Sequence, residues 1–191
     1  MFNIREIDYD KEEYERLREK QTASEEIFDG VILHVFRDKV ELPNGDASVR
    51  EVIAHVEAVC VVPVDSDGNV ILERQYRYPI DAVITEIPAG KLDYEGEDHL
   101  EAAKRELREE TGITAADFEY IGPFYPTCAY STEVIHLYFA WNLTFGEREL
   151  DDDENINVEM MDIREVADMI LRGLVPDGKT QTAVLKVLAK L

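Results

Sequence analysis

The apolar and polar residues of this chain alternate first with the period of a strand and later with that of a helix. Between about Glu25 and His55, the segments VILHVFR and VREVIAH alternate on either side of the turn PNGD, which predicts a β-meander of two or three strands. The segments VEAVCVVPV and NVILERQYRY are more continuously apolar and flank the turn DSDG. They predict two buried strands joined as a hairpin.

After the segment EIPAG the spacing becomes helical. Apolar residues recur at i, i+3 and i+7, beginning at Leu100. Asp98 stands three residues before a glutamate in the form of an N-terminal capping box, and Gly112 stands where helices commonly end. We therefore predict a helix over 99–111.

The rest of the chain mixes strands and helices. FEYIGPFY, EVIHLYFAWNL and INVEMMDI predict strands, and REVADMILRG and TQTAVLKVLAKL predict two helices. Because no regular βαβ repetition appears, the pattern predicts an α/β sandwich built on a mixed sheet. We divide the chain into residues 1–55, an appended N-terminal β-meander, and residues 56–191, the main domain. His136, inside an apolar strand, is interpreted as structural.

The composition limits the binding partners and the cellular compartment that we expect for this protein. Of 191 residues, 42 are acidic and 20 basic, giving a formal net charge of -22 that repels nucleic acid and anionic membrane surfaces. No run approaches the ~20 apolar residues of a membrane span, and the N-terminus lacks the apolar centre of a secretory signal. Cys60 and Cys128 have no close spacing typical of a disulfide framework. We expect a cytoplasmic protein.

The segment RELREETG, residues 105–112, crowds three carboxylates onto the predicted helix. Glu106, Glu109 and Glu110 lie three and four residues apart and therefore project from neighbouring positions on its surface. Two interpretations are open for this segment taken alone. It is either a solvated face balanced by its arginines or a metal site.

The segment from Gly90 to Ile113 resembles the Nudix box, the signature of hydrolases that cleave a nucleoside diphosphate linked to another group. The matching letters are Gly90, Glu97, Arg105, Glu106, Leu107, Glu109, Glu110, Gly112 and Ile113. Six residues separate Gly90 from Glu97 where the family has five, whereas the spacing from Glu97 onward is intact. The resemblance implies a Nudix-type α/β/α sandwich around a mixed β-sheet, with a small N-terminal antiparallel β-sheet appended.

The resemblance also implies a metal cofactor, Mg²⁺ or Mn²⁺. Both ions prefer oxygen ligands and bridge carboxylates to substrate phosphates. The implied ligands are the carbonyl of Ala89 and the carboxylates of Glu106, Glu109 and Glu110. Arg105 is implied to pair with Glu97 and to hold the helix and its entry loop in register.

RQYRYPI followed by EIPAGKLD is similar to the ADP-ribose pyrophosphatase branch of the family. In that branch Arg77 is implied to bind phosphate and Glu86 to lie near the phosphates or metals. After the box, Tyr130 and Glu133 match the branch and are implied to contact substrate, although Cys128 and Ala129 replace its Pro-Gly pair.

The loop LDDDEN is the implied source of one more acidic group. Glu154 is favoured as metal ligand or base, Asp152 is the neighbouring candidate, and the role of Asp153 stays open. As a charge run alone this loop is typical of a solvated segment, and beside the box the two interpretations are equally open.

The resemblance implies hydrolysis of ADP-ribose or a related nucleoside diphosphate sugar to a nucleoside monophosphate and a sugar phosphate. GDP-mannose, NADH and dinucleoside polyphosphates are alternative substrates. A regulator that binds ADP-ribose without cleaving it is an alternative of another class. The N-terminal strands resemble a sheet that the branch uses to dimerise, which implies a homodimer.

Overall fold

The computed structural model describes residues 10–94, 96–149 and 155–191. The chain forms two compact units. One comprises Met1–His55 with Thr127–Glu133, and the other comprises Val56–Pro126 with Val134–Leu191. None of the described helices is long and apolar enough to cross a membrane.

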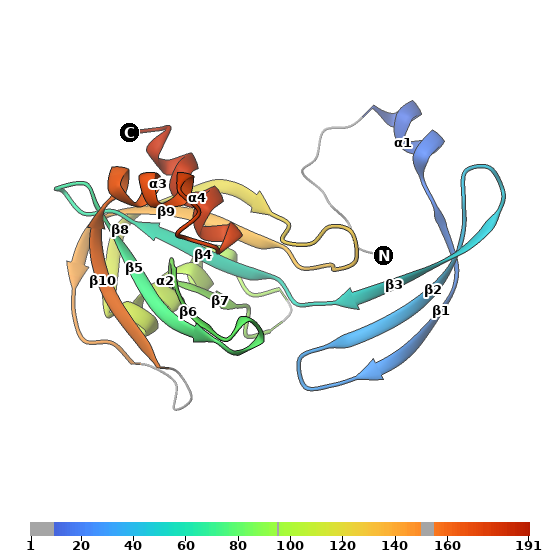
Figure 1. Ribbon diagram of the computed structural model, residues 1–191, viewed down its shortest axis with the longest axis horizontal. Coiled ribbons are helices and arrows are strands. Elements are labelled where there is room, and N and C mark those ends of the chain that lie inside the picture. The colour runs from blue at the N-terminus through green and yellow to red at the C-terminus, as the bar shows by residue number, and fades with distance from the viewer. Residues whose placement is uncertain (1–9, 95, 150–154) are drawn as a thin grey trace. The chain divides into compact units, whose positions relative to one another are not determined.

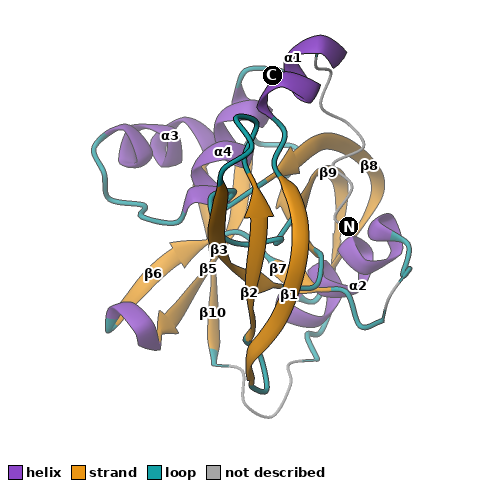
Figure 2. Ribbon diagram, turned by 90° about the vertical axis from the view of Figure 1, so that its right-hand side faces the viewer, coloured by secondary structure: helices purple, strands orange, loops and turns teal. Residues whose placement is uncertain are grey.

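The first unit contains the predicted meander, which has three strands. They form an antiparallel sheet in the order β1-β2-β3 (Figure 2). Its segment 127–133 joins this unit through Ile53, whose N–H donates to the carbonyl of Tyr130 and whose carbonyl accepts from Thr132. The elements are α1 (Lys11–Leu17), β1 (Lys20–Asp29), β2 (His34–Glu41) and β3 (Ala47–Ala54).

The second unit is built on two sheets. A four-stranded mixed sheet has the order β7-β4-β9-β8, in which β4 and β9 are parallel, and an antiparallel sheet has the order β10-β5-β6. The strands are β4 (Ala58–Pro63), β5 (Asn69–Arg77), β6 (Ala82–Glu86), β7 (Ala89–Lys91), β8 (Ile113–Phe124), β9 (Ile135–Phe145) and β10 (Ile156–Asp162). A 3-10 turn, η1 (Tyr78–Ile80), joins β5 to β6.

The predicted hairpin of β4 and β5 is wrong. The two segments share one bridge beside their turn, between Val64 and Val70, and then enter different sheets. Strand β4 has β7 and β9 as its neighbours, so both of its edges are occupied by other strands. The continuous apolar run of β4 therefore reflects burial on both faces and not pairing with β5.

Helices cover both faces of the mixed sheet (Figure 1). Val61 of β4 packs in one apolar cluster with Leu107 of α2, and Val62, on the opposite face, packs in another with Val184 of α4. Alternate residues of a strand face opposite sides, so an apolar run is required where both sides are covered. The helices are α2 (His99–Thr111), α3 (Ile163–Leu171) and α4 (Gly178–Leu188).

Candidate active site

The helix that carries the clustered glutamates, α2, spans His99–Thr111, the range predicted for it. The Asp98 side chain accepts hydrogen bonds from the N–H groups of Leu100 and Glu101, which satisfies free donors of the first turn. At the other end Gly112 adopts φ 73°, a left-handed conformation that glycine adopts without steric cost. Local capping thus fixes both ends of the helix.

Two of the three clustered glutamates are buried. Leu107 of the same helix is 0% exposed and anchors α2 in the core, whereas Glu106 and Glu110 are 9% and 5% exposed. The Glu109 side chain is 30% exposed. Burying a carboxylate is costly unless cations or hydrogen-bond donors surround it. A solvated surface therefore does not explain Glu106 and Glu110.

The short strand β7 lies directly against these carboxylates. The backbone N–H of Ala89 donates a hydrogen bond of 2.9 Å to Oε2 of Glu110. The next residue, Gly90, is so close to Glu106 that a Cβ there would lie 2.0 Å from its Cδ. The additional residue in the loop after Gly90 thus leaves this glycine in contact with the helix.

Arg105 is the cation at the centre of the cluster. Its Nη1 lies 2.7 Å from Oε1 of Glu106 and 3.4 Å from Oε2 of Glu109, while its Nη2 lies 3.3 Å from Oε2 of Glu97. Burial lowers the pKa of Arg105, but the hydrogen bond with Glu97 and the charge of Glu106 raise it more, so the net shift is upward. The guanidinium is therefore permanently charged and holds the carboxylates in fixed directions.

A second group of charges surrounds Glu86, whose side chain is 3% exposed. Arg77 donates two hydrogen bonds to its carboxylate, from Nε to Oε1 at 2.6 Å and from Nη2 to Oε2 at 2.7 Å. Lys179 also contacts Glu86 and lies 3.1 Å from Asp177. Burial raises the pKa of Glu86, but the hydrogen bond from Arg77 and the charge of Lys179 lower it below its ordinary value.

The two groups of charges influence each other. The pKa of Arg77 is raised chiefly by its hydrogen bond with Glu86, and further by the charges of Asp177 and Glu110. Glu73, which is 3% exposed, lies opposite Glu86 in the register of β5 and β6. The pattern of the sequence did not single out Glu73 or Lys179, because a charged residue inside a strand or in the first turn of a helix is ordinarily solvent-exposed.

Four predicted site residues remain, of which two lie in the first unit and two lie outside the described residues. Tyr130, 53% exposed, and Glu133 belong to the first unit, where a carboxylate oxygen of Glu133 lies 4.0 Å from Nδ1 of His55. Asp152 and Glu154 lie outside the described residues. Their roles therefore stay predictions.

Within the described ranges, two groups of three side chains bring potential metal-ligating atoms within 4.8 Å of one another, and neither group includes Glu106, Glu109 or Glu110. The first joins Glu57, His99 and His136, and the second joins Glu26, Asp29 and His34. His136, interpreted from the sequence as structural, is thus part of a cluster of polar side chains.

Comparison with known families identifies the family to which the chain belongs. The model of the NUDIX domain matches residues 54–181, and that of the nucleoside diphosphate sugar hydrolase N-terminal domain matches residues 19–53. The chain belongs to the Nudix family. It is a Nudix hydrolase, as its box predicts, and the family uses divalent metals.

Individual Nudix relatives cover nearly the whole chain. An ADP-ribose pyrophosphatase of Bacillus subtilis (strain 168) is 40% identical over 88% of this chain and 91% of its own length. A protein of Bacillus methanolicus named methanol dehydrogenase activator is 38% identical over 87% of this chain and 90% of its own. The crystal structure of an ADP compounds hydrolase superposes with a TM-score of 0.81 at 24% identity, covering 91% of this chain and 94% of the other. The predicted Nudix fold is confirmed.

Proposed function

We propose that this Nudix hydrolase cleaves the pyrophosphate bond of ADP-ribose or a related nucleoside diphosphate sugar. The products are a nucleoside monophosphate and a sugar phosphate. The observation that carries the proposal is the burial of Glu106 and Glu110 against Ala89 and Gly90, in a chain 40% identical to an ADP-ribose pyrophosphatase. Buried carboxylates on one helix suit a polyanionic substrate only when cations join the two.

The residues of α2 fit Mg²⁺ or Mn²⁺. Both ions take oxygen ligands, and Glu106, Glu109 and Glu110 supply carboxylates within one turn of helix, beside the backbone of Ala89. The missing side chain at Gly90 leaves room for the carboxylate of Glu106 to lie against its backbone. When bound, the ions would neutralise negative charge on the pyrophosphate. They would also lower the pKa of a bound water, so that it can attack phosphorus.

The other residues are assigned roles around that centre. Arg105 positions the carboxylates of Glu106 and Glu109 through its contacts with both. Arg77, whose side chain is 44% exposed although it holds Glu86, can present its free edge to a substrate phosphate. The residues assigned by resemblance alone are Tyr130 and Glu133 as substrate contacts and Glu154, or its neighbour Asp152, as base or additional metal ligand.

We further propose that the protein is a cytoplasmic homodimer whose partners are small molecules and not nucleic acid or membranes. The net charge of -22 supports the exclusion of polyanions. The dimer is supported by strand β1, which is exposed at every position, and by a run of exposed apolar side chains in its last residues and just after it. These side chains are Ile27, Phe28, Val31, Ile32 and Leu33. A monomer mass in light scattering would remove the dimer.

A regulator of another enzyme is the second candidate. The Bacillus methanolicus relative, 38% identical, is named as an activator of methanol dehydrogenase. The intact set of Arg105, Glu106, Glu109 and Glu110 favours hydrolysis, because a protein that only binds another protein does not need four buried or half-buried charges on one helix. GDP-mannose, NADH and dinucleoside polyphosphates are alternative substrates for the same chemistry.

The test mixes purified protein with ADP-ribose and MgCl₂ and follows AMP and ribose phosphate by chromatography, beside a panel of the alternative substrates. We expect AMP from the wild type and a loss of about 100-fold or more in Glu110→Gln. Glu101→Gln is the matched control, because Glu101 lies on the same helix but is exposed and pairs with Lys104. Absence of AMP from the wild type refutes the substrate, and full turnover by Glu110→Gln refutes the ligand assignment.

A further inference from the structure

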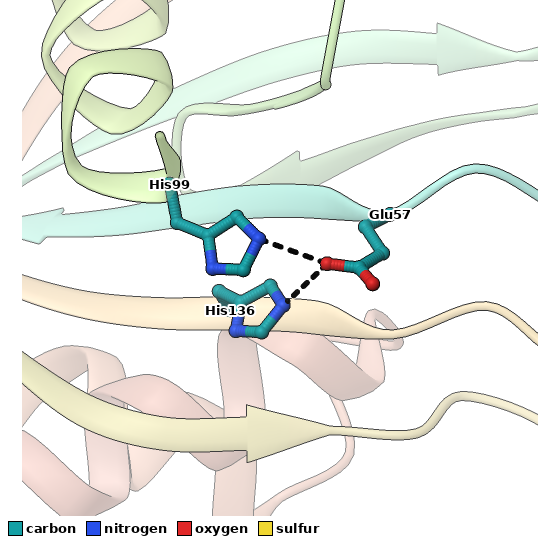
Figure 3. A group of neighbouring side chains, drawn as sticks. All are labelled: Glu57, His99 and His136. Carbon is teal, nitrogen blue, oxygen red and sulfur yellow. Dashed lines mark hydrogen bonds and ion pairs between the residues drawn. The ribbon is translucent and has the colours of Figure 1, made fainter. Parts of the chain in front are cut away.

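Three side chains from separate elements converge on one point, and none of them belongs to the glutamate cluster of α2 (Figure 3). The carboxylate of Glu57, immediately before β4, places Oε2 2.8 Å from Nε2 of His99 and 3.0 Å from Nε2 of His136. His99 is the first residue of α2, and His136 belongs to β9. The two imidazole rings stack with their centroids 3.6 Å apart, so both present Nε2 toward the same carboxylate oxygen.

We propose that Glu57, His99 and His136 bind a divalent transition-metal ion such as Zn²⁺, separately from the ions of the Nudix box. Two imidazole nitrogens and one carboxylate oxygen form a donor set typical of Zn²⁺ sites that keep a fourth position for water. Nitrogen ligands favour Zn²⁺ over Mg²⁺, which prefers oxygen. The all-carboxylate cluster of α2 has the opposite preference, so one chain offers two chemically distinct sites.

The distances suit such an ion. In a tetrahedral site with Zn–N bonds of about 2.0–2.1 Å, neighbouring ligand atoms lie about 3.3 Å apart. The three ligand atoms here already lie within 4.8 Å of one another, and the Glu57 oxygen is 2.8 and 3.0 Å from the two nitrogens. Binding an ion would therefore require these atoms to adjust to separations of about 3.3 Å, with the two stacked imidazole rings turning so that both nitrogens face the ion.

The surroundings orient one ligand. The hydroxyl of Tyr120 lies 3.1 Å from Nδ1 of His136, on the side of the ring away from Glu57. When Nδ1–H donates to that hydroxyl, Nε2 carries the lone pair that a metal requires. A partner on the second nitrogen is the usual device that fixes the tautomer and the direction of a ligating histidine.

Solvent reaches all three side chains of the cluster. The exposed fractions of the side chains are 48% for Glu57, 34% for His99 and 13% for His136. An ion can therefore enter and keep a water ligand. The first turn of a helix carries a positive partial charge, which disfavours a cation at His99. The negative charge of Glu57 offsets this effect, so the site needs the carboxylate as well as the two histidines.

A bound ion would connect the start of α2 to β4 and β9. Because α2 carries Glu106, Glu109 and Glu110, the ion would restrain the helix on which the box depends. The second cluster, Glu26 with Asp29 and His34, has a single imidazole and two exposed carboxylates, and therefore a weaker preference for Zn²⁺.

The experiment titrates the full-length protein with ZnCl₂ in excess MgCl₂, which saturates the oxygen sites, and measures stoichiometry and affinity by calorimetry. We expect one tightly bound Zn²⁺ per chain in the wild type. His99→Gln and His136→Gln should each weaken binding more than 10-fold, and Tyr120→Phe should weaken it about 10-fold. His34→Gln, from the second cluster, is the matched control and should bind like the wild type.

Visible absorption of Co²⁺ in place of Zn²⁺ provides a readout independent of activity, since nitrogen ligands and low coordination number alter its spectrum. Circular dichroism verifies that each variant is folded. His99→Gln, whose side chain is 34% exposed, keeps the test valid if His136→Gln does not fold. The proposal is overturned if the wild type takes up no Zn²⁺ in excess MgCl₂, or if His99→Gln binds it as tightly as the wild type.

Discussion

The backbone of Gly90 lies against the carboxylate of Glu106. A Cβ at position 90 would lie 2.0 Å from Cδ of Glu106 and 2.1 and 2.2 Å from its two oxygens. The carboxylate cannot move aside freely, because it is 9% exposed and Arg105 holds Oε1 at 2.7 Å. This contact explains in physical terms why the first letter of the box is a residue without a side chain.

Gly90→Ala should therefore displace the Glu106 carboxylate while the fold survives, because the colliding atoms are the end of a side chain and not backbone. We expect the concentration of Mg²⁺ needed for half-maximal hydrolysis to rise about 10–100-fold. Activity measured over a Mg²⁺ titration tests this expectation, with thermal unfolding to verify the fold. Gly178→Ala, whose Cβ would meet the ring of Phe124 at 3.2 Å, is the control. Wild-type Mg²⁺ dependence in Gly90→Ala would contradict the argument.

Gly112→Ala should instead destabilise the fold. Gly112 has φ 73°, and a Cβ there would lie 2.6 Å from the carbonyl oxygen of Gly146 and 2.8 Å from the backbone nitrogen of Arg148. Backbone atoms cannot rotate away as a side chain can. We expect a loss of at least about 2 kcal/mol in the free energy of unfolding, measured in urea. Gly68→Ala, with φ 87° and no atom within 4 Å of its Cβ, should lose only about 1 kcal/mol. Equal losses in the free energy of unfolding in both variants would show that the contacts of the new Cβ at position 112 with the backbone do not destabilise the fold.

Helix α2 could be predicted to the residue because its signals are local. An apolar period, a capping aspartate and a terminal glycine act within 15 residues of sequence, and they need no knowledge of the rest of the chain. The meander of β1, β2 and β3 was predictable for the same reason, since its turns are short.

Long-range contacts could not be predicted in this way. The apolar run of β4 correctly indicated burial, but not that β4 pairs in parallel with β9 and leaves β5 to another sheet. Glu86 and Lys179 are 93 residues apart in the sequence, and Glu57 and His136 are 79 apart. No period or turn signal connects such pairs, because only the packing of the whole unit brings them together.

Arg105→Lys should lower activity although the charge is preserved. One ammonium group cannot contact Glu97, Glu106 and Glu109 together, whereas the guanidinium contacts Glu97 through Nη2 and both Glu106 and Glu109 through Nη1. We expect turnover to fall about 10–100-fold with a smaller change in the apparent affinity for ADP-ribose. Steady-state kinetics at saturating Mg²⁺ distinguish the two quantities. Arg172→Lys is the control, because Arg172 is 64% exposed and its partner is the equally exposed Asp168. Similar kinetics in the two variants would contradict a positioning role for Arg105.

Lys179→Met should reduce stability because it removes one of the two cations that compensate the buried carboxylate of Glu86. The side chains of Lys179 and Glu86 are 10% and 3% exposed, so solvent does not replace the lost partner. We expect a decrease of about 3 kcal/mol in the free energy of unfolding at pH 7. Lys104→Met removes the exposed partner of Glu101 and should change stability by less than about 1 kcal/mol.

The pH dependence of the free energy of unfolding shows why Lys179 stabilises the fold. The pKa of Glu86 is lowered in the folded protein below its ordinary value of 4.5, so the stabilisation is complete above that value and is lost as the pH falls through the folded pKa. Without the charge of Lys179 the folded pKa of Glu86 is lowered less, and the variant has less stability to lose in acid. The difference between wild type and Lys179→Met, measured by urea denaturation from pH 7 to pH 4 and below, should therefore shrink as the pH falls. Parallel curves would mean that Lys179 stabilises the fold through packing and not through the charge of Glu86.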